Sequence, residues 1–248
     1  MDEILAKKLI FLADKYENLS FCDEDPSQFL RWYNIDTQIA DVEVCSFIAA
    51  MIAFGNRKQF IPKIKEILEL ADKNNGIASW IKSGAKGFPK GNKKFYRFYS
   101  YDDFLCFFNE ISLILKDNQT LGLFFEEKYK EEQKHLCDLI SDAFPNSKIV
   151  PKGKASAKKR INMFLRWMIR KNSSVDLGIW NWFSEKDLII PLDIHVLKEA
   201  ISLGLLSEKS TASRKNAVLL TEKMSQIFVD DPCRADFALF GLGVDTNR

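Results

Sequence analysis

The chain has 248 residues, of which 46% are hydrophobic and 28% charged, so we expect a folded protein with a full core rather than a disordered chain. Its formal net charge of +2 argues neither for nor against a polyanionic partner. The sequence has no signal peptide and no apolar run long enough to span a membrane, which predicts a soluble, cytoplasmic protein.

The five cysteines also favour a cytoplasmic location. They are odd in number, widely spaced and mostly set among apolar residues, as reduced core cysteines are. No pair has the spacing of metal ligands. We therefore expect neither a bound metal nor another cofactor.

Hydrophobic periods near 3.6 residues dominate, and no convincing alternating run is bounded by hairpin turns. This pattern predicts an all-α fold with short connections. The expected helices span residues 2–16, 27–33, 38–54, 58–73, 101–115, 121–143, 156–171, 194–203, 211–228 and 232–240.

Charge is unevenly distributed along these elements. Residues 57–98 carry 11 Lys and Arg against 3 Asp and Glu, and residues 148–171 carry 9 against none. Two basic segments favour a one-sided electrostatic surface, although solvated helix faces explain the first segment equally well. The longest irregular segment, residues 83–100, interleaves glycines with lysines and ends near the sequence FYRFY, so it could follow a phosphate backbone.

The most informative stretch has the sequence IPLDIHV, at residues 190–196. It places Asp193 between a proline-stopped apolar segment and the start of a helix, where the helix dipole favours a carboxylate. Thirty-four residues earlier, Lys159 opens another amphipathic helix after a basic turn at residues 151–158. The lysine and the aspartate could share one cleft. The simpler interpretation is a helix N-cap and a solvated basic turn.

This pair resembles the catalytic pair of the helix-hairpin-helix (HhH-GPD) DNA glycosylase superfamily, in which a hairpin lysine attacks the sugar and a later aspartate assists. The resemblance covers about residues 38–244. Residues 156–168 and 189–195 also resemble an uncharacterised bacterial family of unknown function related to these enzymes. Archaeal 8-oxoguanine DNA glycosylases are the most similar members, with a wide Lys-to-Asp interval and a late Asp-x-x-x-aromatic element that Asp236 and Phe240 match.

The resemblance implies two interlocked helical lobes that form a single unit over residues 1–248, with the active site between the lobes. It implies a monomeric DNA glycosylase with AP-lyase activity that removes an oxidised base, with oxidised guanine as the expected lesion. The partner would be double-stranded DNA containing a damaged base, which must be flipped out of the helix.

Lys159 is the expected nucleophile, because Lys158, Arg160 and partial burial disfavour its charged form. Lys158 is the alternative, since only one of two adjacent helical side chains faces the cleft, and the apolar stripe of the helix favours Lys159. Asp193 would oppose positive charge on the sugar and shuttle a proton. The expected substrate-binding residues are Asn56 and Arg57, as a polar wedge in the gap left by the flipped base, with Lys158, Phe164, His195, Asp236 and Phe240.

The sequence also departs from the superfamily pattern. The Leu-Pro-Gly-Val-Gly hairpin is replaced by residues 151–156, which contain one glycine. The segment therefore does not match the hairpin whose backbone N–H groups bind phosphate in the superfamily. An inserted segment, residues 172–187, carries Trp180, Trp182 and Phe183, which belong either to a pocket or to the core. Asp236 and Phe240 are open to a similar structural interpretation, as a helix acid and a buried ring.

Three other functions stay open at this stage. One is a monofunctional glycosylase in which Asp193 activates water and Lys159 only contacts phosphate. Another is a non-catalytic DNA-binding helical protein that kept the fold. The third is a helical protein-interaction domain, which the modest net charge favours.

Overall fold

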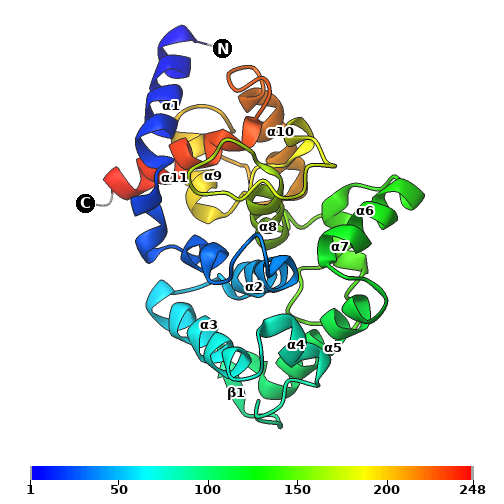
Figure 1. Ribbon diagram of the computed structural model, residues 1–248. Helices are drawn as coiled ribbons and strands as arrows, with labels where there is room; N and C mark the ends of the chain where they lie inside the picture. Colours follow the sequence, from blue (N-terminus) through cyan, green and yellow to red (C-terminus); the bar gives the residue numbers. More distant parts are fainter. Residues whose placement is uncertain (1, 247–248) are drawn as a thin grey trace. The chain divides into compact units, whose positions relative to one another are not determined.

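In the computed structural model, residues 2–246 are described and are mostly helical, which confirms the predicted all-helical character (Figure 1). Within these residues, strand is confined to one hairpin, formed by β1 (Lys94–Tyr96) and β2 (Tyr99–Ser100). The sequence did not predict this hairpin. Strands of three and two residues are too short for an alternating pattern, and Arg97 rather than glycine takes the left-handed turn conformation, with φ +50°.

The chain divides into two compact units. Unit 1 comprises residues 1–23 and 152–248, and unit 2 comprises residues 24–151. The interlocking of two helical lobes remains a prediction.

Unit 2 is built around α2 (Ile39–Ile52), whose residues 42–52 are all buried. A helix that is buried on every side requires partners on every side. These partners include η2 (Pro26–Arg31), α3 (Arg57–Asp72), α4 (Ile77–Lys82) and α6 (Leu121–Glu132). The unit is completed by α5 (Tyr101–Asp117) and α7 (Leu136–Asp142).

Two helices of unit 2 differ from the predictions. The six-residue α4 was not predicted, because one and a half turns are too few to establish a helical period. The single helix predicted over residues 121–143 is wrong, since Gln133 adopts a left-handed conformation with φ +52° and ends α6. A left-handed residue at this position is a common helix terminator.

Unit 1 contains α1 (Glu3–Tyr16), α8 (Lys159–Ile169), α9 (Ile194–Ser202), α10 (Arg214–Met224) and α11 (Ala235–Thr246). Short 3-10 helices are η1 (Leu19–Glu24), η3 (Glu185–Asp187) and η4 (Pro232–Arg234). Helices α1 and α11 pack side by side, so the two parts of this unit, which are distant in sequence, share one core (Figure 1).

A buried ion network fixes α8 within unit 1. Arg170 pairs with Glu17 at 2.8 Å and with Asp231 at 2.6 Å, and it also pairs with Asp176. Arg166 lies one helical turn earlier and contacts Asp176 at 3.3 Å. Because each buried guanidinium faces several carboxylates, the network ties α8 to segments before and after it in the chain.

Candidate active site

Lys159 is the first residue of α8, so the helix begins where the basic turn ends. Lys158 precedes it in a left-handed conformation, with φ +46°, that few non-glycine residues adopt. Lys158 is only 5% exposed, whereas the side chain of Lys159 is 30% exposed. This difference in access favours Lys159 over Lys158 as the residue that meets a ligand.

Asp193 is the N-cap of α9, which confirms the predicted cap. Its Oδ1 accepts hydrogen bonds from the backbone N–H of His195 at 2.9 Å and of Val196 at 3.0 Å. Its Oδ2 lies 3.8 Å from Nζ of Lys159. The structure therefore brings the lysine and the aspartate together, and one carboxylate both caps the helix and faces the amine.

The pair is partly open to solvent, with side-chain exposures of 30% for Lys159 and 28% for Asp193. Such an ion pair contributes little to stability, since water screens it. As with any lysine, only the neutral amine form of this side chain can act as a nucleophile.

Asp236 lies in the first turn of α11 and is buried in contact with Arg166. Burial raises the pKa of Asp236 to about 6, against the opposing effects of Arg166 and Lys159 and with a further increase from Asp193. Asp236 thus interacts electrostatically with both members of the lysine–aspartate pair. The Arg166 guanidinium also lies 4.4 Å from the ring centroid of Phe237, so a buried cation fixes this end of α11.

The other predicted ligand residues of unit 1 differ in access. His195 is exposed on the first turn of α9, next to Asp193. Phe240 is half-buried, with its ring centroid 5.3 Å from that of Phe21. Phe164 is fully buried and packs edge-on against Trp180 at 5.3 Å. The placement of Phe164 does not support the prediction that it binds substrate, because its position on α8 points it into the core.

The aromatic residues of the inserted segment also contribute to the core. Trp180 and Phe183 are buried, and Trp182 stacks on Trp180 with centroids 5.5 Å apart. The core interpretation is therefore correct for Trp180 and Phe183.

Asn56 and Arg57 lie in unit 2, on the turn between α2 and α3. The side chain of Asn56 caps α3 by accepting a hydrogen bond from the N–H of Lys58 at 2.9 Å. Arg57 lies 3.4 Å from Asp25. A cap explains why a polar residue stands at this turn, and the wedge role stays a prediction.

The β-hairpin packs on this same turn, a relationship that the sequence did not predict. Tyr96 donates a hydrogen bond to the carbonyl of Phe54, and the Arg97 guanidinium lies 5.7 Å from the Phe54 ring. Phe98 is 58% exposed, with its ring 5.5 Å from that of Phe54. An exposed aromatic ring and a cation therefore contact Phe54, which precedes Asn56 by two residues in the chain. The sequence FYRFY within a basic segment was the available signal.

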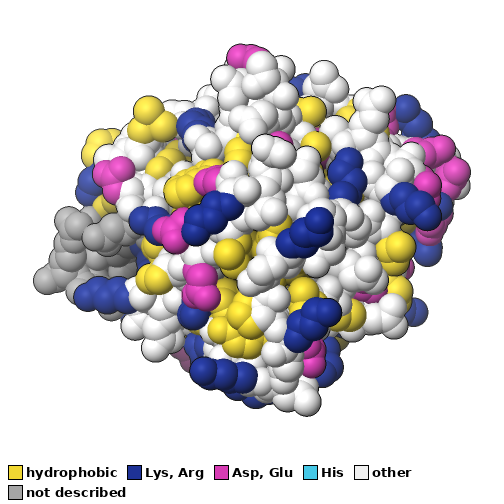
Figure 2. Space-filling view, turned by 60° about the horizontal axis from the view of Figure 1, so that its bottom comes forward, with side chains coloured by type: hydrophobic (Ala, Val, Ile, Leu, Met, Phe, Trp, Pro, Cys, Tyr) yellow, Lys and Arg dark blue, Asp and Glu magenta, His cyan; other side chains and the backbone are white. Residues whose placement is uncertain are grey.

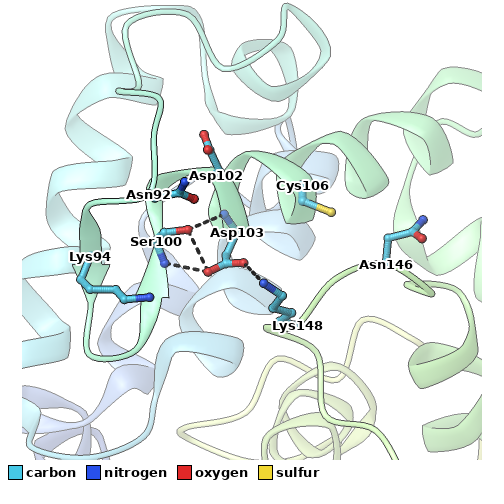
Figure 3. Close-up of a pocket in the computed structure, with 8 residues that line it drawn as sticks. All are labelled: Asn92, Lys94, Ser100, Asp102, Asp103, Cys106, Asn146 and Lys148. Carbon is cyan, nitrogen blue, oxygen red and sulfur yellow. Dashed lines mark hydrogen bonds and ion pairs between the residues drawn. The ribbon is translucent and has the colours of Figure 1, made fainter.

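Unit 2 also contains a polar cavity of about 450 Å³, lined by Asn92, Lys94, Ser100, Asp102, Asp103, Cys106, Asn146 and Lys148 (Figure 3). Ser100 and Asp103 form the capping box of α5, and Lys148 pairs with Asp103 at 2.9 Å. Burial by itself would raise the pKa of Asp103. The hydrogen bonds from Ser100 and Lys148 together outweigh burial, so the pKa of Asp103 lies below its normal value. Lys148 thus belongs to a local ion pair of unit 2, although it opens the basic segment at residues 148–171.

The surface charge is mixed. On the face shown in Figure 2, lysine and arginine side chains are spread among hydrophobic and acidic ones and form no single continuous patch. No group of three or more His, Cys, Asp or Glu among residues 2–246 could hold a metal ion. None of the helices formed by these residues is long and apolar enough to cross a membrane.

Comparison with known proteins gives a family. Residues 25–245 match the family described as a protein of unknown function, DUF2400. The chain belongs to this family. No curated protein and no solved structure matches the chain.

Proposed function

We propose that this DUF2400 protein is a DNA glycosylase with AP-lyase activity that removes an oxidised base, with oxidised guanine as the expected lesion. The observation that carries the proposal is the 3.8 Å approach of Lys159 Nζ to Asp193 Oδ2 in a partly exposed site. An amine beside a carboxylate is the combination that covalent attack on a sugar carbon requires.

The reaction begins with transfer of a proton from Lys159 to a base, for which Asp193 is the nearest acceptor. The amine nitrogen then bonds to C1′ of a flipped-out nucleotide as the bond from C1′ to the base breaks, and the base leaves with the electron pair and takes up a proton. As Asp193 passes the proton from Lys159 to the departing base, it regains its negative charge and opposes the positive charge that develops on the sugar. Its fixed position as a helix cap means that little reorganisation is needed.

The lyase step follows from the same adduct. A proton moves from the amine nitrogen to O4′ as the bond between C1′ and O4′ breaks. This opening of the sugar ring leaves a protonated imine between Lys159 and C1′, which acidifies the hydrogens at C2′. Loss of one C2′ proton to a base and departure of the 3′ phosphate cleave the strand by β-elimination. Hydrolysis of the remaining imine returns Lys159.

Unit 2 supports the DNA part of the proposal. Disrupting base stacking requires groups that can replace the stacked partners. Asn56 and the exposed ring of Phe98 lie on adjoining turns, with Arg57 and Arg97 beside them. A polar wedge, an aromatic ring and two cations have the chemistry that an opened duplex requires.

A monofunctional glycosylase is the second candidate, and the ion pair itself favours it. Nζ of Lys159 lies 3.8 Å from the Asp193 carboxylate, and a lysine that remains in such an ion pair is not a nucleophile. In this mechanism Asp193 activates a water molecule, and Lys159 contacts phosphate.

Borohydride trapping on a panel of damaged duplexes separates the candidates, because reduction of the imine leaves a stable protein–DNA adduct. The panel includes 8-oxoguanine opposite each normal base, an abasic site and an undamaged duplex. A covalent adduct on a lesion duplex, absent from the undamaged one, is the expected result. Base release without an adduct would favour the monofunctional enzyme. If neither an adduct nor a released base forms, the protein has a non-catalytic role.

A further inference from the structure

A groove of about 560 Å³ lies in unit 1 between the basic turn and α10, apart from the lysine–aspartate pair. Lys154, Arg214 and Lys215 contribute cations to its lining. Ala155, Val218 and Leu219 contribute apolar surface. Of the three cations, only Lys154 belongs to the basic turn that the sequence predicts at residues 151–158.

Backbone contacts hold the two walls of the groove together. Ser156 and Ser213 form an isolated antiparallel bridge, and the N–H of Arg214 donates to the carbonyl of Ala155 at 2.9 Å. The turn therefore has a defined position against α10. Ala155 precedes Lys159, the first residue of α8, by four residues in the chain.

The lining of the groove combines positive charge with apolar surface. Its charged residues are three cations and one acid, Glu222. The sugar–phosphate backbone of DNA has the complementary pattern, with one negative charge on each phosphate and apolar faces on the deoxyribose between them. A neutral apolar ligand would match only the apolar part of this lining.

We propose that this groove binds the sugar–phosphate backbone of duplex DNA, with Lys154, Arg214 and Lys215 on phosphates and Leu219 against a sugar. The proposal rests on DNA being the substrate, and it assigns DNA contacts to α10. A strand held here continues towards Lys159, because the same turn forms the wall of the groove and leads into α8. Contacts to the backbone position the duplex without reading its sequence.

The test measures the salt dependence of binding to an undamaged, fluorescein-labelled 20-base-pair duplex by anisotropy. Each phosphate contact contributes about 0.9 to the slope of log affinity against log salt. The double change Arg214→Gln with Lys215→Gln is expected to flatten that slope by about 2 units. The matched control is Lys7→Gln with Lys8→Gln, which removes two exposed cations of α1 and is expected to leave the slope unchanged.

A second pair of variants tests the apolar part of the lining. Leu219→Glu places a negative charge in the groove and should weaken duplex binding about tenfold or more at low salt. Val229→Glu places the same charge at an exposed apolar residue that does not line the groove, and it should have a much smaller effect. Thermal melting identifies any variant that fails to fold. In that case Lys154→Gln, on the opposite wall of the groove, replaces the misfolded variant in the measurement of log affinity against log salt.

The outcomes separate this proposal from the proposed function. An unchanged slope in the Arg214 and Lys215 variant, with wild-type trapping on lesion DNA intact, would overturn the groove alone. A flattened slope without any trapping or base release would overturn the glycosylase and support the groove. An acidic peptide of alternating glutamate and leucine that binds the groove, with the DNA slope unaffected, would also overturn the proposal.

Discussion

Asp193 meets Lys159 with one carboxylate oxygen and caps α9 with the other. Oδ2 lies 3.8 Å from the lysine Nζ, while Oδ1 accepts hydrogen bonds from two backbone N–H groups. The carboxylate is therefore held in place by the helix that it caps. The same side chain has a structural role as a cap and a proposed chemical role, so the variants that test them must be chosen to separate the two.

Replacing Lys159 tests the nucleophile. Lys159→Gln is expected to abolish the adduct trapped by borohydride on lesion DNA while leaving duplex affinity within a few fold, because it removes the amine but only one charge. The control is Lys198→Gln, an exposed lysine of α9, which should be trapped normally. Full trapping by Lys159→Gln would transfer the role to Lys158 or eliminate it.

Replacing Asp193 separates the cap from the chemistry. Asparagine caps helices as well as aspartate does, so Asp193→Asn should keep the fold yet lower base excision by about two orders of magnitude or more. Asp193→Ala should in addition lose about 1 kcal/mol of unfolding free energy, as measured by urea denaturation. If Asp193→Asn excises the base at the wild-type rate, the residue is only a cap.

Asp236 predicts a pH dependence of stability. Its pKa is raised from 3.8 to about 6 in the folded protein, so between these pH values the folded chain holds a proton that the unfolded chain releases. The unfolding free energy of the wild type should therefore fall relative to Asp236→Asn as pH rises from about 4 to about 6, by about 3 kcal/mol at most. Parallel denaturation curves across this range, with a constant difference, would contradict the shift.

The hairpin predicts a contribution to DNA binding from unit 2. Phe98→Ala is expected to weaken binding to a lesion duplex roughly tenfold, since a stacked aromatic contributes about 1–3 kcal/mol per base. Leu113→Ala is a matched control, because Leu113 has the same exposure of 58% and lies in the same unit, on α5. Equal affinities for the two variants would show that Phe98 does not contact DNA.

The buried network predicts a large effect on stability away from the pair. Arg170→Ala leaves Asp176, Asp231 and Glu17 without their shared cation and should cost about 3–5 kcal/mol of unfolding free energy. Lys186→Ala breaks an exposed pair with Asp230 and should cost less than about 1 kcal/mol. Urea denaturation of both variants provides the comparison, and similar losses would rule out a special role for the buried network.

The sequence by itself determined the helical character, most helix positions and the N-cap at Asp193. These features depend on interactions between residues a few positions apart, namely the apolar period of a helix and the hydrogen bond of a cap. Lys159 was correctly placed at the start of its helix for the same reason. Helix α4 and the break at Gln133 were missed, because their local signals are short or absent.

Only the tertiary structure decided which distant residues meet. The contact between Arg166 and Asp236 joins residues 70 positions apart, and the pKa of Asp236 depends on the burial that this packing produces. Likewise, the periodicity of α8 places Phe164 on the apolar face of the helix but does not show whether that position faces the core or a pocket. The structure shows that Phe164 is buried in the core. Distances between chain-distant side chains and their access to solvent are properties of the packed core, which a local pattern does not encode.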